Sequence, residues 1–417
     1  MNYIIQNATL IDSSHPLHNQ QVHIVIENGV IQNISQNPIH SSDHEIISFE
    51  NLHVSLGWMD SSVSFGEPGF EDRETLANGL SVAAKSGFTH VALNPSNSPV
   101  TDNVTVVKYL LNQSQGFATT LLPIGACTKN EEGIDLAEMY DMHKGGAIAF
   151  GDYKKSFTNA NLLKIALQYV QDFDGKVIAF ANDSSIKGKG VVHEGIVSTQ
   201  LGLKGIPALA EEVVIARNLY ILEYTGGNLH IPTISTKGSV ELVREAKAKG
   251  LQVTCSVAVH NLALTDDVLH NFDTRYKVFP PIRDKNHQEA LLNAVLDGTI
   301  DCITSDHYPL DIEHKKMEFD LAKDGTIGLE SAFGILNTFL PLDVIIEKLT
   351  AAKRIFINEK SSIEMNNPAS LTLFTPEGET TFTKANILSK SKNSAFLNQT
   401  MKGKVYGIIN NGKWIKN

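Results

Sequence analysis

The sequence predicts an α/β fold in which a (β/α)8 barrel of the TIM type carries a small β-domain. Residues 56–367 alternate apolar, strand-like runs with segments of helical periodicity, whereas residues 1–55 and 368–417 contain only strand-like runs and turns. Repeated strand–helix units imply parallel strands, and eight of them fit a closed barrel. A doubly wound open sheet is the alternative. It is disfavoured because no glycine-rich GxGxxG or GxxxxGK loop follows any strand.

The two ends of the chain are expected to build one composite β-sandwich domain, from residues 1–55 and 368–417. The N-terminal part contains VHIVIENGVIQNIS, in which ENG is a hairpin turn between two alternating runs. The C-terminal part contains GKVYGIINNGKWIK, with a second hairpin turn at NNG.

Eight apolar runs in the middle of the chain are the expected barrel strands: HVSLGWMD, THVALN, TTLLPIGA, GAIAF, KVIAFAN, NLHIPTIS, LQVTCSVAV and TIDCITSD. Segments with a period of 3.6 residues lie between them, including ETLANGLSVAAKSG, NLLKIALQYVQDFD, PALAEEVVIARNLYILEYTG, SVELVREAKAKG and NHQEALLNAVLDG. Gly87 and Gly250 stand where helices commonly end.

Composition narrows the function classes. The 46 acidic and 35 basic residues are scattered along the chain, so the net charge of -11 includes no basic stripe for a nucleic acid. Cys127, Cys255 and Cys302 form no CxxC pair, which indicates buried thiols in a reducing compartment. The N-terminus does not resemble a signal peptide, and no apolar run approaches the roughly 20 residues of a membrane span. We expect a cytoplasmic protein with no membrane partner.

Polar residues at strand ends are the candidate site, because chemistry in such barrels lies at the carboxyl ends of the strands. No HxH, HExxH or GxSxG motif occurs, and only His260 and His307 fall at expected strand ends. The pair Asp306 and His307 is the best candidate for a functional carboxylate, since an acid that closes a buried strand needs a partner or a proton. Asp306 could equally cap the following loop through backbone N–H groups.

Taken in order, the strand ends resemble those of dihydroorotase in the amidohydrolase superfamily, in particular the bacterial type associated with aspartate carbamoyltransferase. The similar phrases span the chain and include DSSVSFGEPGFEDRETLANG, EGIVSTQLGLKGIPALAEE, FPPIRDK, TSDHYP and SAFLNQTMKGKVYGIINNGK. The resemblance implies a barrel in which one or two zinc ions activate water for the reversible cyclisation of N-carbamoyl-L-aspartate to L-dihydroorotate.

The same resemblance implies that most metal ligands are missing here. The family's HxH falls on Ser62 and Ser64, and its two further histidines fall on Phe180 and Thr233. Asp152, at the position of a bridging acid, and Asp306, at the position of the general base, remain. Hydroxyls and a phenyl ring do not replace imidazoles on zinc, so we expect no metal cofactor.

The positions that the family uses for substrate have also changed. By the same resemblance, the arginine after HxH is Gly66, the asparagine of the second loop is Ser96, the asparagine before PPLR is Phe279, and the histidine after DHAP is Leu310. A dicarboxylate substrate would lose its guanidinium clamp.

Three functions therefore remain open. The leading expectation is a catalytically inactive, homo-oligomeric dihydroorotase-like protein that serves as a structural partner of aspartate carbamoyltransferase. The second is an active zinc-dependent amidohydrolase whose metal is held by Asp152, Asp306 and either His260 or His307. The third is a small-molecule binding module whose metal-free pocket is lined by Phe180, Phe279 and Leu310.

Overall fold

The computed structural model describes residues 2–39, 41–359 and 362–417. Its central sheet has eight parallel strands: β6 (Trp58–Val63), β7 (Phe88–Leu93), β8 (Thr120–Gly125), β9 (Ala149–Phe150), β10 (Lys176–Ile178), β13 (Asn228–Ile231), β14 (Val253–Ala258) and β15 (Cys302–Thr304). Each strand pairs with the next along the chain. This order confirms the barrel and excludes a doubly wound sheet, which would reverse its strand order.

The first and last strands close the barrel at the level of the candidate site. Val63 forms a parallel bridge with His307, and the backbone N–H of Ser64 donates to the carbonyl of His307 over 2.8 Å. All eight expected runs supply barrel strands. One run divides at Gly57, because its first half, β5 (His53–Leu56), pairs in the other large sheet.

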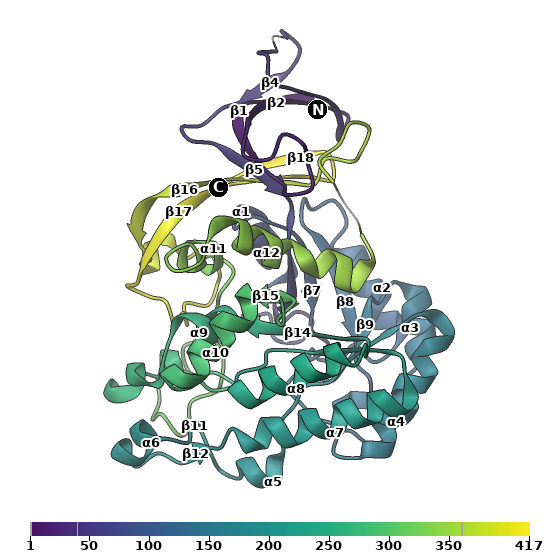
Figure 1. Cartoon of the computed structure of the whole chain (residues 1–417), viewed down its shortest axis with the longest axis vertical. Coiled ribbons are helices and arrows are strands. Elements are labelled where there is room, and N and C mark those ends of the chain that lie inside the picture. Colours follow the sequence, from purple (N-terminus) through teal and green to yellow (C-terminus); the bar gives the residue numbers. More distant parts are fainter. Residues whose placement is uncertain (1, 40, 360–361) are drawn as a thin grey trace.

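Longer helices surround the barrel, and shorter ones lie in the loops between its strands and helices (Figure 1). They are α1 (Leu76–Lys85), α2 (Val104–Gln113), α3 (Met139–Gly145), α4 (Ala160–Val170), α5 (Ser184–Lys187), α6 (Ile196–Leu201), α7 (Leu209–Thr225), α8 (Lys237–Ala248), α9 (Val259–Ala263), α10 (Lys285–Leu296), α11 (Ala332–Leu336) and α12 (Leu342–Ile357). The five expected helices correspond to α1, α4, α7, α8 and α10. Gly87 and Gly250 follow α1 and α8 with φ of 96° and 82°, left-handed values that favour glycine.

The two ends of the chain build a second large sheet, which lies at the top of Figure 1 and contains both termini. Its strands are β1 (Asn2–Ile11), β2 (Gln21–Glu27), β3 (Val30–Ser35), β4 (Glu45–Ile47), β5, β16 (Leu371–Thr381), β17 (Thr400–Asn410) and β18 (Lys413–Lys416). They form one continuous hydrogen-bonded sheet around its own apolar core, which confirms the expected small β-domain built from both ends of the chain. A pair of very short strands, β11 (Val192–His193) and β12 (Gly205–Ile206), stands apart.

Both predicted hairpin turns are present. Asn28 and Gly29 join β2 to β3 with φ of 50° and 79°, and Asn411 and Gly412 join β17 to β18 with φ of 51° and 71°. Positive φ at both central residues is the geometry that makes Asn-Gly a favourable hairpin turn.

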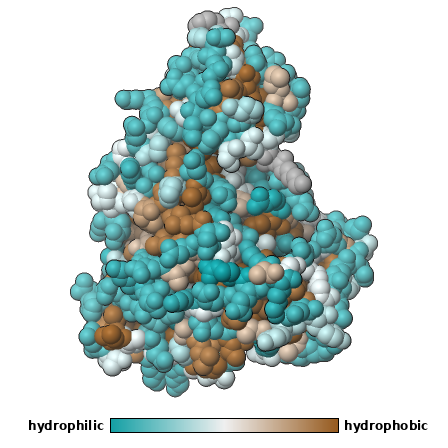
Figure 2. All heavy atoms as spheres, viewed as in Figure 1, coloured by the Kyte–Doolittle hydropathy of each residue, from teal (hydrophilic) through white to brown (hydrophobic). Residues whose placement is uncertain are grey.

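The surface and the core agree with a water-exposed globular chain. Figure 2 shows a mostly hydrophilic face, with hydrophobic residues gathered over α11, between the upper sheet and the barrel. The three cysteines are free and buried, as expected. Among the described residues, none of the helices combines the length and the apolar character that crossing a membrane requires.

Candidate active site

The residues at the six family metal positions do come together at the carboxyl ends of the strands. Ser62, Asp152, Phe180 and Thr233 line one small cavity of about 30 Å³. Asp306 joins them because its carboxylate accepts a hydrogen bond from the Ser62 hydroxyl over 3.2 Å. This end of the barrel is the candidate site, and the groups that its side chains carry decide what it can do.

Asp306 is fully buried and paired with a cation. Its Oδ2 lies 2.8 Å from Nζ of Lys154, and its Oδ1 accepts hydrogen bonds from the hydroxyls of Tyr153, over 3.1 Å, and Ser62. Only 1% of the Asp306 side chain and 15% of the Lys154 side chain are exposed. A buried carboxylate with these donors has little capacity left to bind a metal ion or to take a proton from a substrate.

Lys154 was not identified as a site residue from the sequence. It follows Asp152 by two residues, just after β9, and its φ of 54° is a left-handed value that turns the chain sharply at the strand end. A detectable signal was present: two consecutive lysines, at 154 and 155, follow an acid at a strand end that faces a barrel mouth. A cation at that place requires an anionic partner, and Asp306 was the available one.

Asp152 supports a neighbouring loop. Its Oδ1 accepts hydrogen bonds from the backbone N–H groups of Cys127 and Thr128, each over 3.0 Å, and its Oδ2 accepts one from the Thr128 hydroxyl. Burial raises the pKa of Asp152, although these hydrogen bonds act in the opposite direction. This carboxylate thus accepts hydrogen bonds from the loop after β8 and does not bridge toward Asp306.

The two serines at the HxH position form a hydrogen-bonded pair with Asn94. The side-chain amide of Asn94 donates to Ser62 over 3.2 Å and to Ser64 over 3.1 Å. The other two substituted positions carry no metal-binding group. Phe180 packs on Phe279 with ring centroids 5.3 Å apart, and Thr233 has a φ of 48°.

These residues do not fit a zinc ion. Ser62, Phe180 and Thr233 offer hydroxyls and a phenyl ring where zinc prefers imidazole, thiolate or carboxylate. A fixed ammonium group on Asp306 would also repel a second cation. The donor set and the charge both oppose metal binding at this place.

The four altered substrate positions have structural uses of their own. Gly66 has a φ of 98°, and a Cβ atom there would lie 2.5 Å from the carbonyl oxygen of Phe70. The Ser96 hydroxyl donates to the carboxylate of Glu131 over 2.7 Å, and burial raises the pKa of that glutamate. Leu310 is buried. None of the four offers a cationic clamp for a dicarboxylate.

His260 and His307, the two histidines at expected strand ends, are buried close to this site. His260 is 1% exposed, and neither of its ring nitrogens has a hydrogen-bond partner among the described residues. Burial lowers its pKa to about 4. Nδ1 of His307 accepts the backbone N–H of Gly328 over 3.2 Å, and burial lowers the pKa of His307 to about 3. Both rings are therefore neutral at pH 7.

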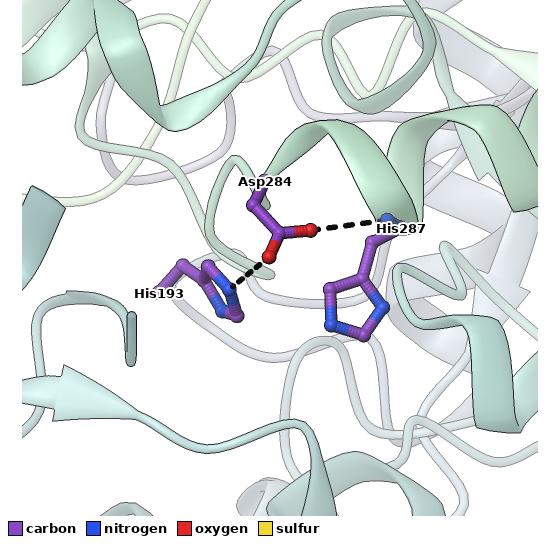
Figure 3. Close-up of side chains that lie close together, drawn as sticks. All are labelled: His193, Asp284 and His287. Atoms are coloured by element: carbon purple, nitrogen blue, oxygen red, sulfur yellow. Dashed lines mark hydrogen bonds and ion pairs between the residues drawn. The ribbon is translucent and has the colours of Figure 1, made fainter. Parts of the chain in front are cut away.

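A second cluster, which the sequence patterns did not indicate, lies at the start of α10 (Figure 3). His193, Asp284 and His287 are the one group of three possible metal ligands among the described residues, with ligand atoms within 4.8 Å of one another. Nε2 of His193 lies 3.5 Å from Oδ2 of Asp284. Because His193 lies 91 residues before Asp284 in the chain, no local motif brings the three residues together.

The hydrogen bonds of this cluster oppose a metal ion. Nδ1 of His193 faces Nη1 of Arg283 at 3.3 Å, and Nδ1 of His287 accepts the backbone N–H of Lys237 over 2.9 Å. A ring that accepts at Nδ1 carries its proton at Nε2, which then has no lone pair for a metal. Burial and the charge of Arg283 lower the pKa of His193 to about 4. We interpret the cluster as a hydrogen-bonded support for α10.

The barrel, the added sheet and the positions at the strand ends define a protein of the amidohydrolase class. Solved structures share the fold: L-hydantoinase (dihydropyrimidinase) from Arthrobacter aurescens superposes with a TM-score of 0.87 at 20% identity, covering 100% of this chain and 96% of that one. The dihydropyrimidinase from Brevibacillus agri NCHU1002 has a TM-score of 0.82 at 18% identity, covering 100% and 95%.

Sequence relatives are closer. Residues 53–239 match the family model described as dihydro-orotase-like. The dihydroorotase of Thermoanaerobacter sp. (strain X514) is 38% identical over 99% of this chain and 97% of its own length, and that of Geotalea daltonii is 35% identical over 99% of each. The chain belongs to the dihydroorotase family.

Proposed function

We propose that this chain is a dihydroorotase-like protein of pyrimidine biosynthesis that no longer catalyses the cyclisation of N-carbamoyl-L-aspartate and acts as a structural partner of aspartate carbamoyltransferase. The observation that carries the first half of the proposal is the ion pair between Lys154 and Asp306. In the family reaction implied by the resemblance, a metal ion supplies hydroxide at neutral pH and Asp306 holds that ion and moves protons. Here the ammonium group of Lys154 forms an ion pair with that carboxylate.

Access to the site supports the same conclusion. Tyr153 and Lys154 line both the small cavity of about 30 Å³ and a second, wider cavity at the barrel mouth. The two side chains therefore form the floor of the wider cavity and separate that cavity from the family metal positions. A substrate that entered the mouth would meet this floor, not Asp152 or Thr233.

The structural half of the proposal rests on what has been retained. The dihydroorotases of Thermoanaerobacter sp. and Geotalea daltonii match this chain over 97% and 99% of their own lengths, which supports a retained scaffold. The partner follows from the resemblance, because the chain resembles the bacterial type of dihydroorotase that is associated with aspartate carbamoyltransferase.

One experiment on the full chain tests both halves. The protein is co-expressed with aspartate carbamoyltransferase of the same organism, and we expect the two to elute together and the transferase to lose activity or stability without this chain. Light scattering on the same fractions tests the expected homo-oligomer. The purified chain should hold no stoichiometric zinc and should not interconvert N-carbamoyl-L-aspartate and L-dihydroorotate. Stoichiometric zinc with turnover would overturn the inactive half, and separate elution would overturn the partner half.

A second candidate is an active, zinc-dependent dihydroorotase or related cyclic amidohydrolase with a rebuilt site. The specific observation in its favour is that Asp152 and Asp306 remain while His260, buried nearby, has two ring nitrogens without hydrogen-bond partners. On this hypothesis Lys154 would have to leave Asp306 when the metal binds. Asp306→Asn should then abolish turnover of N-carbamoyl-L-aspartate, and an unchanged rate would exclude this candidate.

A further inference from the structure

The wider cavity lies at the barrel mouth, on the outer side of the Tyr153 and Lys154 floor. Its volume is about 740 Å³, within the roughly 300–1,000 Å³ typical of small-molecule sites. Segments that follow several different strands line it, including those with Arg73, Lys187 and Tyr308. A cavity built from separate strand ends is where barrels of this kind place ligands.

The lining of the cavity is strongly cationic. Five basic and two acidic side chains contribute to it. Both acids have cationic neighbours. Glu131 lies 3.5 Å from Lys155. The negative charge of Asp324 stabilises the ammonium groups of the buried Lys277 and Lys315. Within the described part of the chain, Arg73, Lys187 and Lys323 have no carboxylate within 4.0 Å. These three charges remain available for an anion.

Arg73 gives the clearest sign of an unfilled interaction. Its Nε is buried and has no hydrogen-bond partner in the part of the chain that the structure describes, while its guanidinium group lies over the ring of Phe70, 4.2 Å from the centroid. Stacking on an aromatic ring holds the planar group in place and leaves its N–H groups free to donate. A buried donor of this kind normally has an acceptor.

Aromatic rings stand beside the cations. Nζ of Lys187 lies 5.4 Å from the centroid of Phe279, and the ring of Tyr308 stacks with Tyr153 at 5.8 Å. Phe279 and Tyr308 both line the cavity. Flat aromatic faces beside fixed positive charges match a ligand that is itself flat and negatively charged.

We propose that this cavity binds a small organic anion whose carboxylate or phosphate is attached to a planar unsaturated ring. The anionic group pairs with Arg73, Lys187 and Lys323, and the ring lies on Phe279 or Tyr308. The proposal goes beyond the structural role proposed above and does not depend on it, because binding requires neither a metal nor a partner. It also differs from retention of the family substrate, since N-carbamoyl-L-aspartate has no ring and L-dihydroorotate has a saturated one.

Calorimetric titration of the full chain with five probes separates the two features. Orotate and uridine 5′-monophosphate carry both a planar ring and an anion, uracil carries only the ring, inorganic phosphate only the anion, and L-dihydroorotate an anion on a saturated ring. We expect orotate, uridine 5′-monophosphate or both to bind at least about tenfold more tightly than the other three, and to bind more weakly as salt is added. Equal binding of phosphate, or no binding of either ringed anion, would overturn the proposal.

Substitutions of lining residues test whether the probes bind in this cavity. Arg73→Gln, Lys187→Gln and Phe279→Leu should each weaken the best probe by about tenfold, because each removes one charged or stacking contact. Lys285→Gln is the matched control, since Lys285 is 78% exposed and does not line the cavity. Unfolding midpoints show whether a variant has folded, and Lys187→Gln changes only an end of the short helix α5. Undiminished binding in both folded charge variants would overturn the assignment to this cavity.

Discussion

The ammonium group of Lys154 lies 2.8 Å from Oδ2 of Asp306, at the position where the family resemblance implies a metal ion. The two changes at this site are physically connected. Removal of four imidazole ligands without compensation would leave Asp306, which is 1% exposed, as a buried charge without a partner. The ammonium group of Lys154, carried on the loop after β9, supplies a positive charge to this carboxylate.

Replacement of Lys154 by Met should therefore destabilise the fold. Loss of one partner of a buried ion pair costs about 3 kcal/mol or more, because the other charge stays buried. Urea unfolding at pH 7 measures this free energy. Lys285→Met, at a 78% exposed position, should change it by less than about 0.5 kcal/mol. Addition of Asp306→Asn to Lys154→Met should restore part of the loss, and a fully stable Lys154→Met variant would show that the pair contributes nothing.

Gly66, at the position that the resemblance assigns to a substrate arginine, has a backbone geometry that leaves no room for a side chain. Gly66→Ala should cost about 2 kcal/mol or more, because a positive φ is combined with a Cβ only 2.5 Å from the Phe70 carbonyl oxygen. Gly116→Ala separates these causes, since Gly116 has a φ of 83° but nothing within 4 Å of its Cβ. It should cost about 1 kcal/mol. Equal unfolding midpoints for the two variants would contradict the steric argument.

The barrel and the place of its site were predictable from the sequence because both depend on local periodicity. Each strand is a short apolar run, and the carboxyl ends of parallel strands must meet at one end of a barrel. Asp152, Thr233 and Asp306 were assigned to that end and lie there. The single continuous sheet of the termini was not predicted, because strand order in a sheet depends on pairings between residues more than 300 positions apart, such as Val54 with Leu373.

The contents of the site were less predictable. That Lys154 reaches Asp306, 152 positions further along the chain, depends on the left-handed turn after β9 and on the direction of one side chain. The role of Asp152 as a support for the Thr128 loop likewise appears only when the two loops are placed side by side. The geometry shows which partners these side chains have, and no local pattern in the sequence reveals them.

The cluster at the start of α10 gives a prediction about metals. We expect the purified chain to bind no stoichiometric zinc at His193, Asp284 and His287, because the Nδ1 atom of each histidine faces an N–H donor. Zinc titration followed by elemental analysis should give the same trace content for wild type, His193→Ala and His287→Ala. One zinc per chain in wild type, lost in His193→Ala, would show that the rings change tautomer and that a metal site exists there.

The pH dependence of stability should carry a contribution from His260. Burial lowers the pKa of this histidine to about 4, and the nearby charge of Asp306 only partly opposes that effect. In the unfolded chain an ordinary histidine takes up its proton near pH 6.5. Between these two values the unfolded state binds more protons than the folded state, so the free energy of unfolding falls as the pH falls. The contribution is complete above pH 6.5, and over the whole window it amounts to about 3 kcal/mol at most.

His260→Leu isolates this contribution from the rest of the protein. The raised pKa values of Asp152 and Glu131 act in the opposite direction, but they are common to both proteins and cancel in the difference. Urea midpoints at pH 7, 6 and 5 should therefore fall less steeply for His260→Leu than for wild type. His270→Leu, at an exposed position, is the control and should follow the wild-type slope. If His260→Leu also followed it, His260 would not be a buried neutral imidazole, and the free ring nitrogens beside Asp306 would need a different explanation.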